Sequence, residues 1–153
     1  MQEHETSAEA RADVLAADEG SYVDLVDGPR AAGGARRIVR AVLLAWELPA
    51  LLDILLLVAT ELVTNAVRHG RPPVRMRLTR TPTELRLHIR DTSSTAPVHR
   101  DERPETDAET GRGVDIVAAL ADEFGWEQLD DGGKIVYASF TRSSEPGRAG
   151  SAV

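Results

Sequence analysis

The chain has 153 residues, 18 of them basic and 25 acidic, so its formal net charge is −7, and 42% of its residues are apolar. This length and apolar content suit one domain with a single core. The sequence holds no cysteine, which excludes disulfides, thiolate metal sites and cysteine nucleophiles. Its only lysine, Lys134, is followed by Ile135, so a GxxxxGK[ST] phosphate loop is excluded, and the acidic balance argues against a general nucleic-acid-binding surface.

The acidic excess is concentrated in two segments, residues 1–19 with a charge of −5 and residues 100–110 with −3. We expect 1–19 to be a flexible acidic tail and 142–153, rich in serine, glycine and proline, to be a second tail. The domain is then 20–141. The start has no apolar signal segment, and charged residues and a proline interrupt the most apolar stretch, 48–63, so we expect a cytoplasmic protein without a membrane span.

The elements are predicted from two spacings: apolar residues three and four apart indicate helices, and alternation indicates strands. In chain order the pattern predicts a strand at 22–26, helices at 31–46 and 49–69, strands at 74–80 and 85–91, a long loop at 92–110, a helix at 114–123, and strands at 126–129 and 134–140. This order indicates an α+β fold, a two-layer α/β sandwich with helices on one face of a mixed, mostly antiparallel sheet. A loop as long as 92–110 is often a functional lid.

Three groups of residues have the chemistry of a site. Glu61 and Asn65 lie four residues apart, on one face of an otherwise apolar helix, where polar groups need partners. Asp91 ends a strand, and the run 111–113 (Gly-Arg-Gly) opens a helix, where backbone N–H groups favour an anion. Read one at a time, Glu61 and Asn65 could instead bond nearby backbone groups or face solvent at the helix end, Asp91 could be a turn residue, and the glycines an ordinary turn or cap.

Taken together, they resemble the N, G1 and G2 boxes of the GHKL ATPase superfamily, which includes gyrase, Hsp90 and the histidine kinases. Residues 61–70 (ELVTNAVRHG) match the run E-x-x-x-N-A-x-x-H of the stand-alone anti-sigma factor serine/threonine kinases of the RsbW and SpoIIAB type. Residues 111–117 (GRGVDIV) match the second signature of that group, and the resemblance covers about 21–141. It implies the Bergerat fold and binding of ATP with Mg²⁺.

The resemblance also implies roles for individual residues. Glu61 would be the general base that takes the proton from a serine or threonine of a partner protein, and Asn65 would be the Mg²⁺ ligand. Asp91 would accept a hydrogen bond from the adenine amino group. The other expected cofactor-binding residues are Ser93, Gly111, Arg112 and Gly113.

The sequence departs from the family pattern around the base site. Ser93 and Thr95 stand where the family has glycines, and Ile135 stands where a hydroxyl residue helps to hold adenine. The leading hypothesis is an ATP- and Mg²⁺-dependent anti-sigma-type kinase, with a STAS-like anti-anti-sigma protein and a sigma factor as partners. The alternative is a regulatory protein-binding module with the same fold and no kinase activity. A homodimer is expected by analogy only, and the chain is too short for a sensor histidine kinase with its own dimerisation helices.

Overall fold

The computed structural model describes residues 21–97 and 108–142. The expected tails at 1–19 and beyond Arg142, and residues 98–107 of the expected lid, lie outside this part. The described helices are α2 (Ala31–Ala45), α3 (Leu52–His69) and α4 (Ala108–Leu120), with 3-10 turns η2 (Gly28–Arg30) and η3 (Pro49–Leu51) before the first two. The described strands are β1 (Val23–Asp24), β2 (Arg75–Arg80), β3 (Glu84–Asp91), β4 (Glu123–Gln128) and β5 (Lys134–Thr141).

The five strands form one sheet in the order β1-β2-β3-β5-β4, and every neighbouring pair is antiparallel. The sheet expected to be mixed is therefore antiparallel throughout in the described residues. Its centre is β3, where Leu87 lies opposite Leu78 of β2 and Ala138 of β5. Residues far apart in sequence thus meet on β3, whose last residue, Asp91, pairs with the first residue of β5, Lys134.

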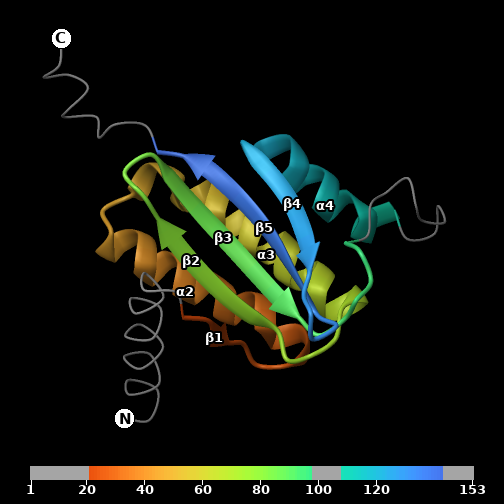
Figure 1. Ribbon diagram of the computed structural model, residues 1–153. Helices are drawn as coiled ribbons and strands as arrows, with labels where there is room; N and C mark the ends of the chain where they lie inside the picture. Colours follow the sequence, from red (N-terminus) through yellow and green to blue (C-terminus); the bar gives the residue numbers. More distant parts are fainter. Residues whose placement is uncertain (1–20, 98–107, 143–153) are drawn as a thin grey trace, which may run out of the picture.

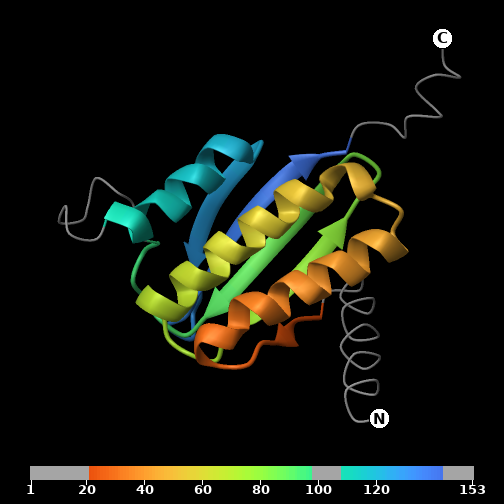
Figure 2. The ribbon, with the colours of Figure 1, turned by 180° about the vertical axis from the view of Figure 1, so that it is seen from behind.

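The three helices cover one face of this sheet, with α3 between α2 and α4 (Figure 2). The inward side chains of β3 are fully buried beneath them. Figure 1 shows the other face, which no described helix covers. Alternation along β2 and β3 places the half-buried Arg77, Arg86 and Arg90 on that face, as expected for a strand with one wet side.

Helix α3 is the centre of the helix layer. Together with η3 it spans 49–69 with a mean hydropathy of 1.9, so by length and composition it could cross a membrane. In the fold it contacts α2, α4 and β3, and Leu55, Val58, Leu62 and Val63 belong to the core. Packing on several sides explains why the helix is apolar around most of its circumference.

Two predicted elements, α4 and β4, have the wrong bounds. The helix expected at 114–123 begins at Ala108 and ends at Leu120, so Gly113 lies inside it. The glycines lower helix propensity there, but Val114 and Val117 are fully buried, and packing outweighs that cost. Strand β4 begins at Glu123, three residues earlier than expected, and runs through Gly125, where a Cβ atom would lie 2.6 Å from the hydroxyl of Tyr137.

Candidate functional site

The C-terminal half of α3 carries the first two site residues. The buried face of this helix continues from Leu62 to Ala66, and Asn65 lies within it with only 7% of its surface exposed. Its amide nitrogen Nδ2 is buried and has no hydrogen-bond partner in the described residues. A buried amide left unpaired costs free energy, so this position is suited to a ligand that supplies an acceptor.

Glu61 lies one turn before Asn65 and faces α4. A Cβ atom on Gly113 would lie 2.5 Å from Oε2 of Glu61, so the absence of a side chain at Gly113 makes room for this carboxylate. Helices α3 and α4 pack against each other at this point. The structure therefore brings Glu61, Asn65 and Gly113 together from two helices that are separate in sequence.

Asp91 ends β3 on the face that the helices cover, and it is 1% exposed. Its Oδ1 accepts a hydrogen bond of 2.7 Å from the backbone N–H of Ser93. Gly70, which follows α3, lies so close that a Cβ there would be 2.7 Å from Oδ2. The end of α3 and the end of β3 thus meet at the Asp91 carboxylate.

Lys134 is the site residue that the sequence prediction missed. Its side chain is buried, and Nζ donates to Oδ1 of Asp91 at 3.1 Å. Nζ also lies 2.9 Å from Oδ2, an ion-pair contact that lacks hydrogen-bond geometry, so Oδ2 has no hydrogen-bond partner in the described part of the chain. Lys134 lies in the same alternating series of β5 as Val136, Ala138 and Phe140, whose side chains are buried. This alternation is the sequence signal that could have revealed that Lys134 faces the core.

The residue expected opposite the base, Ile135, was assigned to the wrong position. It pairs with Arg90 and Glu127 and lies on the opposite face of the sheet from Asp91. The β4–β5 turn sets this register: the N–H of Leu129 bonds the Gly133 carbonyl at 2.8 Å, and a Cβ on Gly133 would lie 2.6 Å from the Asp91 carbonyl oxygen. The residue of β5 that pairs with Asp91 is therefore Lys134.

Residues 25–140, most of the chain and nearly all of the described fold, match the family model for the histidine kinase-like ATPase domain. The chain belongs to this family. A comparison with curated proteins gives no match. The open antiparallel sheet with three helices on one face is consistent with the GHKL ATPase fold, as expected from the sequence.

Histidine kinase-like ATPase domains bind ATP, usually with Mg²⁺. The residues of this chain fit that ligand, because Nδ2 of Asn65 is buried and has no hydrogen-bond partner in the described residues, while Oδ2 of Asp91 is buried with the ion-pair contact to Lys134 as its only polar contact there. The Asn65 amide can offer its oxygen to a hard cation and its N–H to a phosphate oxygen. The Asp91 carboxylate, which is ion-paired with Lys134, can also accept a hydrogen bond from an amino group, so both residues have a partner in the ligand of the family.

Hydrogen bonds hold the backbone of residues 92–95, directly after β3, beside this site. Ser93 is buried, and its Oγ accepts the N–H of Thr95 at 3.1 Å. Thr92 donates from N to the Arg71 carbonyl at 3.0 Å and from Oγ1 to the Pro72 carbonyl at 2.9 Å. Ser93 and Thr95, which replace family glycines, thus hold the start of the loop through their own hydrogen bonds.

The G2-box residues lie in α4. Gly113 is buried inside the helix, while the side chain of Arg112 and the surroundings of Gly111 are outside the described structure. Their role as phosphate-binding donors stays a prediction. The structure does show what Gly113 contributes, namely space for Glu61.

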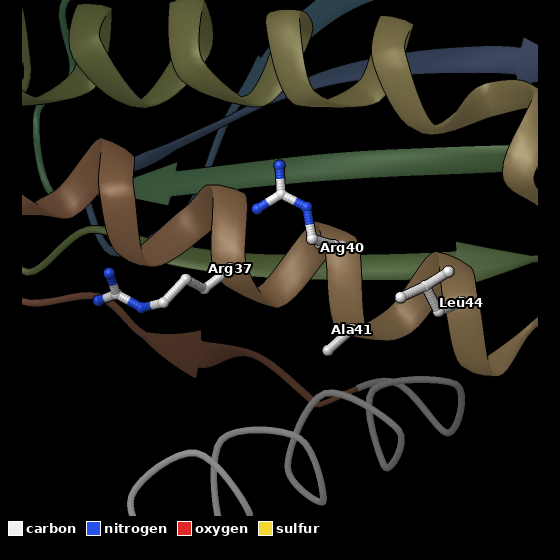
Figure 3. A pocket seen from close by; sticks show the side chains of 4 residues that line it. All are labelled: Arg37, Arg40, Ala41 and Leu44. Atoms are coloured by element: carbon white, nitrogen blue, oxygen red, sulfur yellow. The ribbon is translucent and has the colours of Figure 1, made fainter. Parts of the chain in front are cut away.

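A cavity of about 320 Å³ lies elsewhere, on the outer side of α2 (Figure 3). It is lined by Arg37, Arg40, Ala41 and Leu44, and Leu44 is 60% exposed. Among the described residues that line this hollow there is no carboxylate, histidine or side-chain amide. The converging polar groups at the ends of α3 and β3, rather than this cavity, therefore mark the candidate site.

Proposed function

We propose that this protein is an ATP- and Mg²⁺-dependent serine/threonine protein kinase of the anti-sigma type. Its substrate would be a hydroxyl group on a STAS-like anti-anti-sigma protein in the cytoplasm, a sigma factor would be its second partner, and the phosphorylation would regulate transcription. The observation that supports this is the position of Glu61, a carboxylate one turn from the buried Asn65 amide and in contact range of Gly113. This placement suits a general base beside a phosphate-binding site.

The residues of the chain divide the work of phosphoryl transfer. When bound, ATP would supply the phosphoryl group and Mg²⁺ would neutralise the charge of its phosphates. Asn65 would hold the cation through its amide oxygen, and Asp91 would orient the adenine ring. Glu61 takes the proton of the partner's hydroxyl as that oxygen bonds to the γ-phosphorus and the bond from this phosphorus to the leaving ADP oxygen breaks. Catalysis therefore rests on positioning and on one proton transfer.

A second candidate is the regulatory binding module without kinase activity. The observation that favours it is the ammonium group of Lys134 on the carboxylate of Asp91, 2.9 Å from Oδ2. If this ion pair prevented adenine from binding at Asp91, the fold would serve to hold a partner protein without nucleotide.

The test combines a binding and a transfer measurement. With Mg-ATP and a STAS-like protein from the same organism, Glu61→Gln should lower the rate of phosphorylation by about 10²–10⁴-fold and leave the Kd for ATP within about threefold, because the base acts in the transition state. Asp53→Asn, an exposed carboxylate in the first turn of the same helix, is the matched control and should change neither value. Equal phosphorylation by wild type and Glu61→Gln would refute the kinase mechanism. Absence of ATP binding at millimolar concentration would favour the binding module.

A further inference from the structure

Helix α2 carries an arginine face, formed by Arg36, Arg37 and Arg40, that has no acidic partner in the described part of the chain. All three arginines are exposed, and the 15 residues of α2 include no acid. None of the three forms an ion pair with a described residue. The sequences of α3 and α4, by contrast, each contain both signs of charge. The arginine face is therefore a positive surface that attracts a negatively charged segment.

The same side of α2 also has an apolar part. Arg37 and Arg40 line the hollow of about 320 Å³ together with Ala41 and Leu44, and Figure 3 shows the two arginine side chains extending in different directions from the helix. Leu44 lies four residues after Arg40, on the same side of the helix, and is 60% exposed, whereas Val42 and Leu43 are in the core. This surface therefore suits a segment that combines acidic and apolar side chains.

Residues 1–19, which precede the described part of the chain, have this composition. They contain six carboxylates and one arginine, which gives a charge of −5. Glu5, Glu9 and Asp13 are four residues apart, the spacing of side chains on one face of a helix, and the apolar Leu15 follows them. The chain thus contains a segment whose charge is complementary to the arginine face and which also has an apolar side chain for the hollow.

The connection to β1 keeps this segment close to α2. The segment leads through Ser21 and Tyr22 into β1 at Val23, and Figures 2 and 3 show β1 alongside α2. A helix of 15 residues is about 22 Å long, and an extended chain of 19 residues spans about 60 Å. The segment is therefore long enough to reach every turn of α2. Tethering also raises its effective concentration above that of a separate partner.

We propose that residues 1–19 bind the arginine face of α2 in the same chain. The carboxylates of the segment pair with the three arginines, and Leu15 enters the hollow beside Leu44. Because the arginines are exposed, salt weakens this binding. The bound segment occupies the surface that an acidic partner protein would otherwise use, so the face is open to such a partner only when the segment leaves it. Nucleotide binding is not required for this contact.

The test uses disulfide formation in the full chain, which has no cysteine of its own. With Leu15→Cys and Leu44→Cys, oxidation should give an intramolecular disulfide. Adding Arg37→Gln and Arg40→Gln should slow its formation by about fivefold, because two exposed ion pairs are lost, and about 0.5 M NaCl should slow it as well. The matched control is Leu15→Cys with Val26→Cys. Val26 is 57% exposed, does not line the hollow and is nearer in sequence, so its disulfide depends on tethering alone, and the two arginine substitutions should not slow it.

The products and rates decide between the occupants of the face. Absence of an intramolecular disulfide, or a rate that the arginine substitutions leave unchanged, would overturn the proposal and leave the face to an acidic partner protein. A disulfide-linked dimer as the main product would also overturn it, because the segment would then bind a second copy of the chain. Circular dichroism checks that the variants fold. If the arginine variant does not fold, the salt dependence of the Leu15→Cys and Leu44→Cys chain decides, and a rate independent of salt would overturn the proposal.

Discussion

The contact between Gly113 and Glu61 gives a prediction that separates catalysis from stability. In Gly113→Ala the new Cβ would lie 2.5 Å from Oε2 of Glu61, whereas an ordinary van der Waals contact is 3.4 Å or more. The carboxylate must therefore move by about 1 Å. Oε2 is the far end of a flexible side chain, so this movement is inexpensive, about 1 kcal/mol for a displaced rotamer.

The same substitution stabilises the helix. Gly113 lies inside α4, where alanine is favoured over glycine by about 1 kcal/mol. The two effects nearly cancel, so the free energy of unfolding should change by less than about 1 kcal/mol. Phosphorylation of the partner should nevertheless fall about 100-fold, because a displacement of about 1 Å at a catalytic group costs about that much.

Urea unfolding and a single-turnover phosphorylation assay measure the two quantities. Gly33→Ala in α2 is the matched control: it is the same substitution in an exposed helical position, where the nearest atom to the new Cβ is 3.9 Å away. It should leave activity unchanged and not lower stability. The reasoning fails if Gly113→Ala retains full activity, or if it loses activity only because it unfolds.

The buried and exposed ion pairs and one histidine give the remaining predictions. Lys134→Met should lower the free energy of unfolding by about 3 kcal/mol, because it leaves the buried carboxylate of Asp91 without its cation, and adding Asp91→Asn should recover most of that loss. Arg90→Met breaks the half-exposed pair with Asp131 and should cost less than about 1 kcal/mol; equal losses for the two single variants in urea would contradict the difference in burial. Burial and two neighbouring arginines lower the pKa of His88 from 6.5 to about 4. The unfolded chain therefore binds the extra proton between these values, and stability should fall as pH drops through that window, by about 1–2 kcal/mol after solvent screening. His88→Gln should remove this part of the acid sensitivity, and equal losses in wild type and variant between about pH 7 and pH 4.5 would count against it.

Much of the fold follows from two periodicities in the sequence. Alternation in β3 (Leu85, Leu87, Ile89) and helical spacing in α2 located these elements to within one or two residues, because each has one face in the core. The prediction was poorest at α4, whose first turns contain two glycines. The glycine run predicts a helix start, so the segment before it was assigned to the loop 92–110. Burial of Val114 and Val117 against the rest of the core, which is a long-range property, instead stabilises a helix that begins at Ala108.

In the site, too, residues on one element could be located from local spacing, whereas residues brought together by strand pairing could not. Glu61 and Asn65 could be found from i, i+4 spacing and a motif, since both lie on one helix. Lys134 could not be aligned with Asp91 in this way, because a shift of one residue in β5 exchanges the two faces of the sheet, and the sequence alone assigned the position of the family's hydroxyl residue to Ile135. The β4–β5 turn fixes that register, and with it the charge of the base site. A single lysine, 43 residues from Asp91 in sequence and placed by that turn, thus decides whether the expected adenine carboxylate stands alone or is ion-paired.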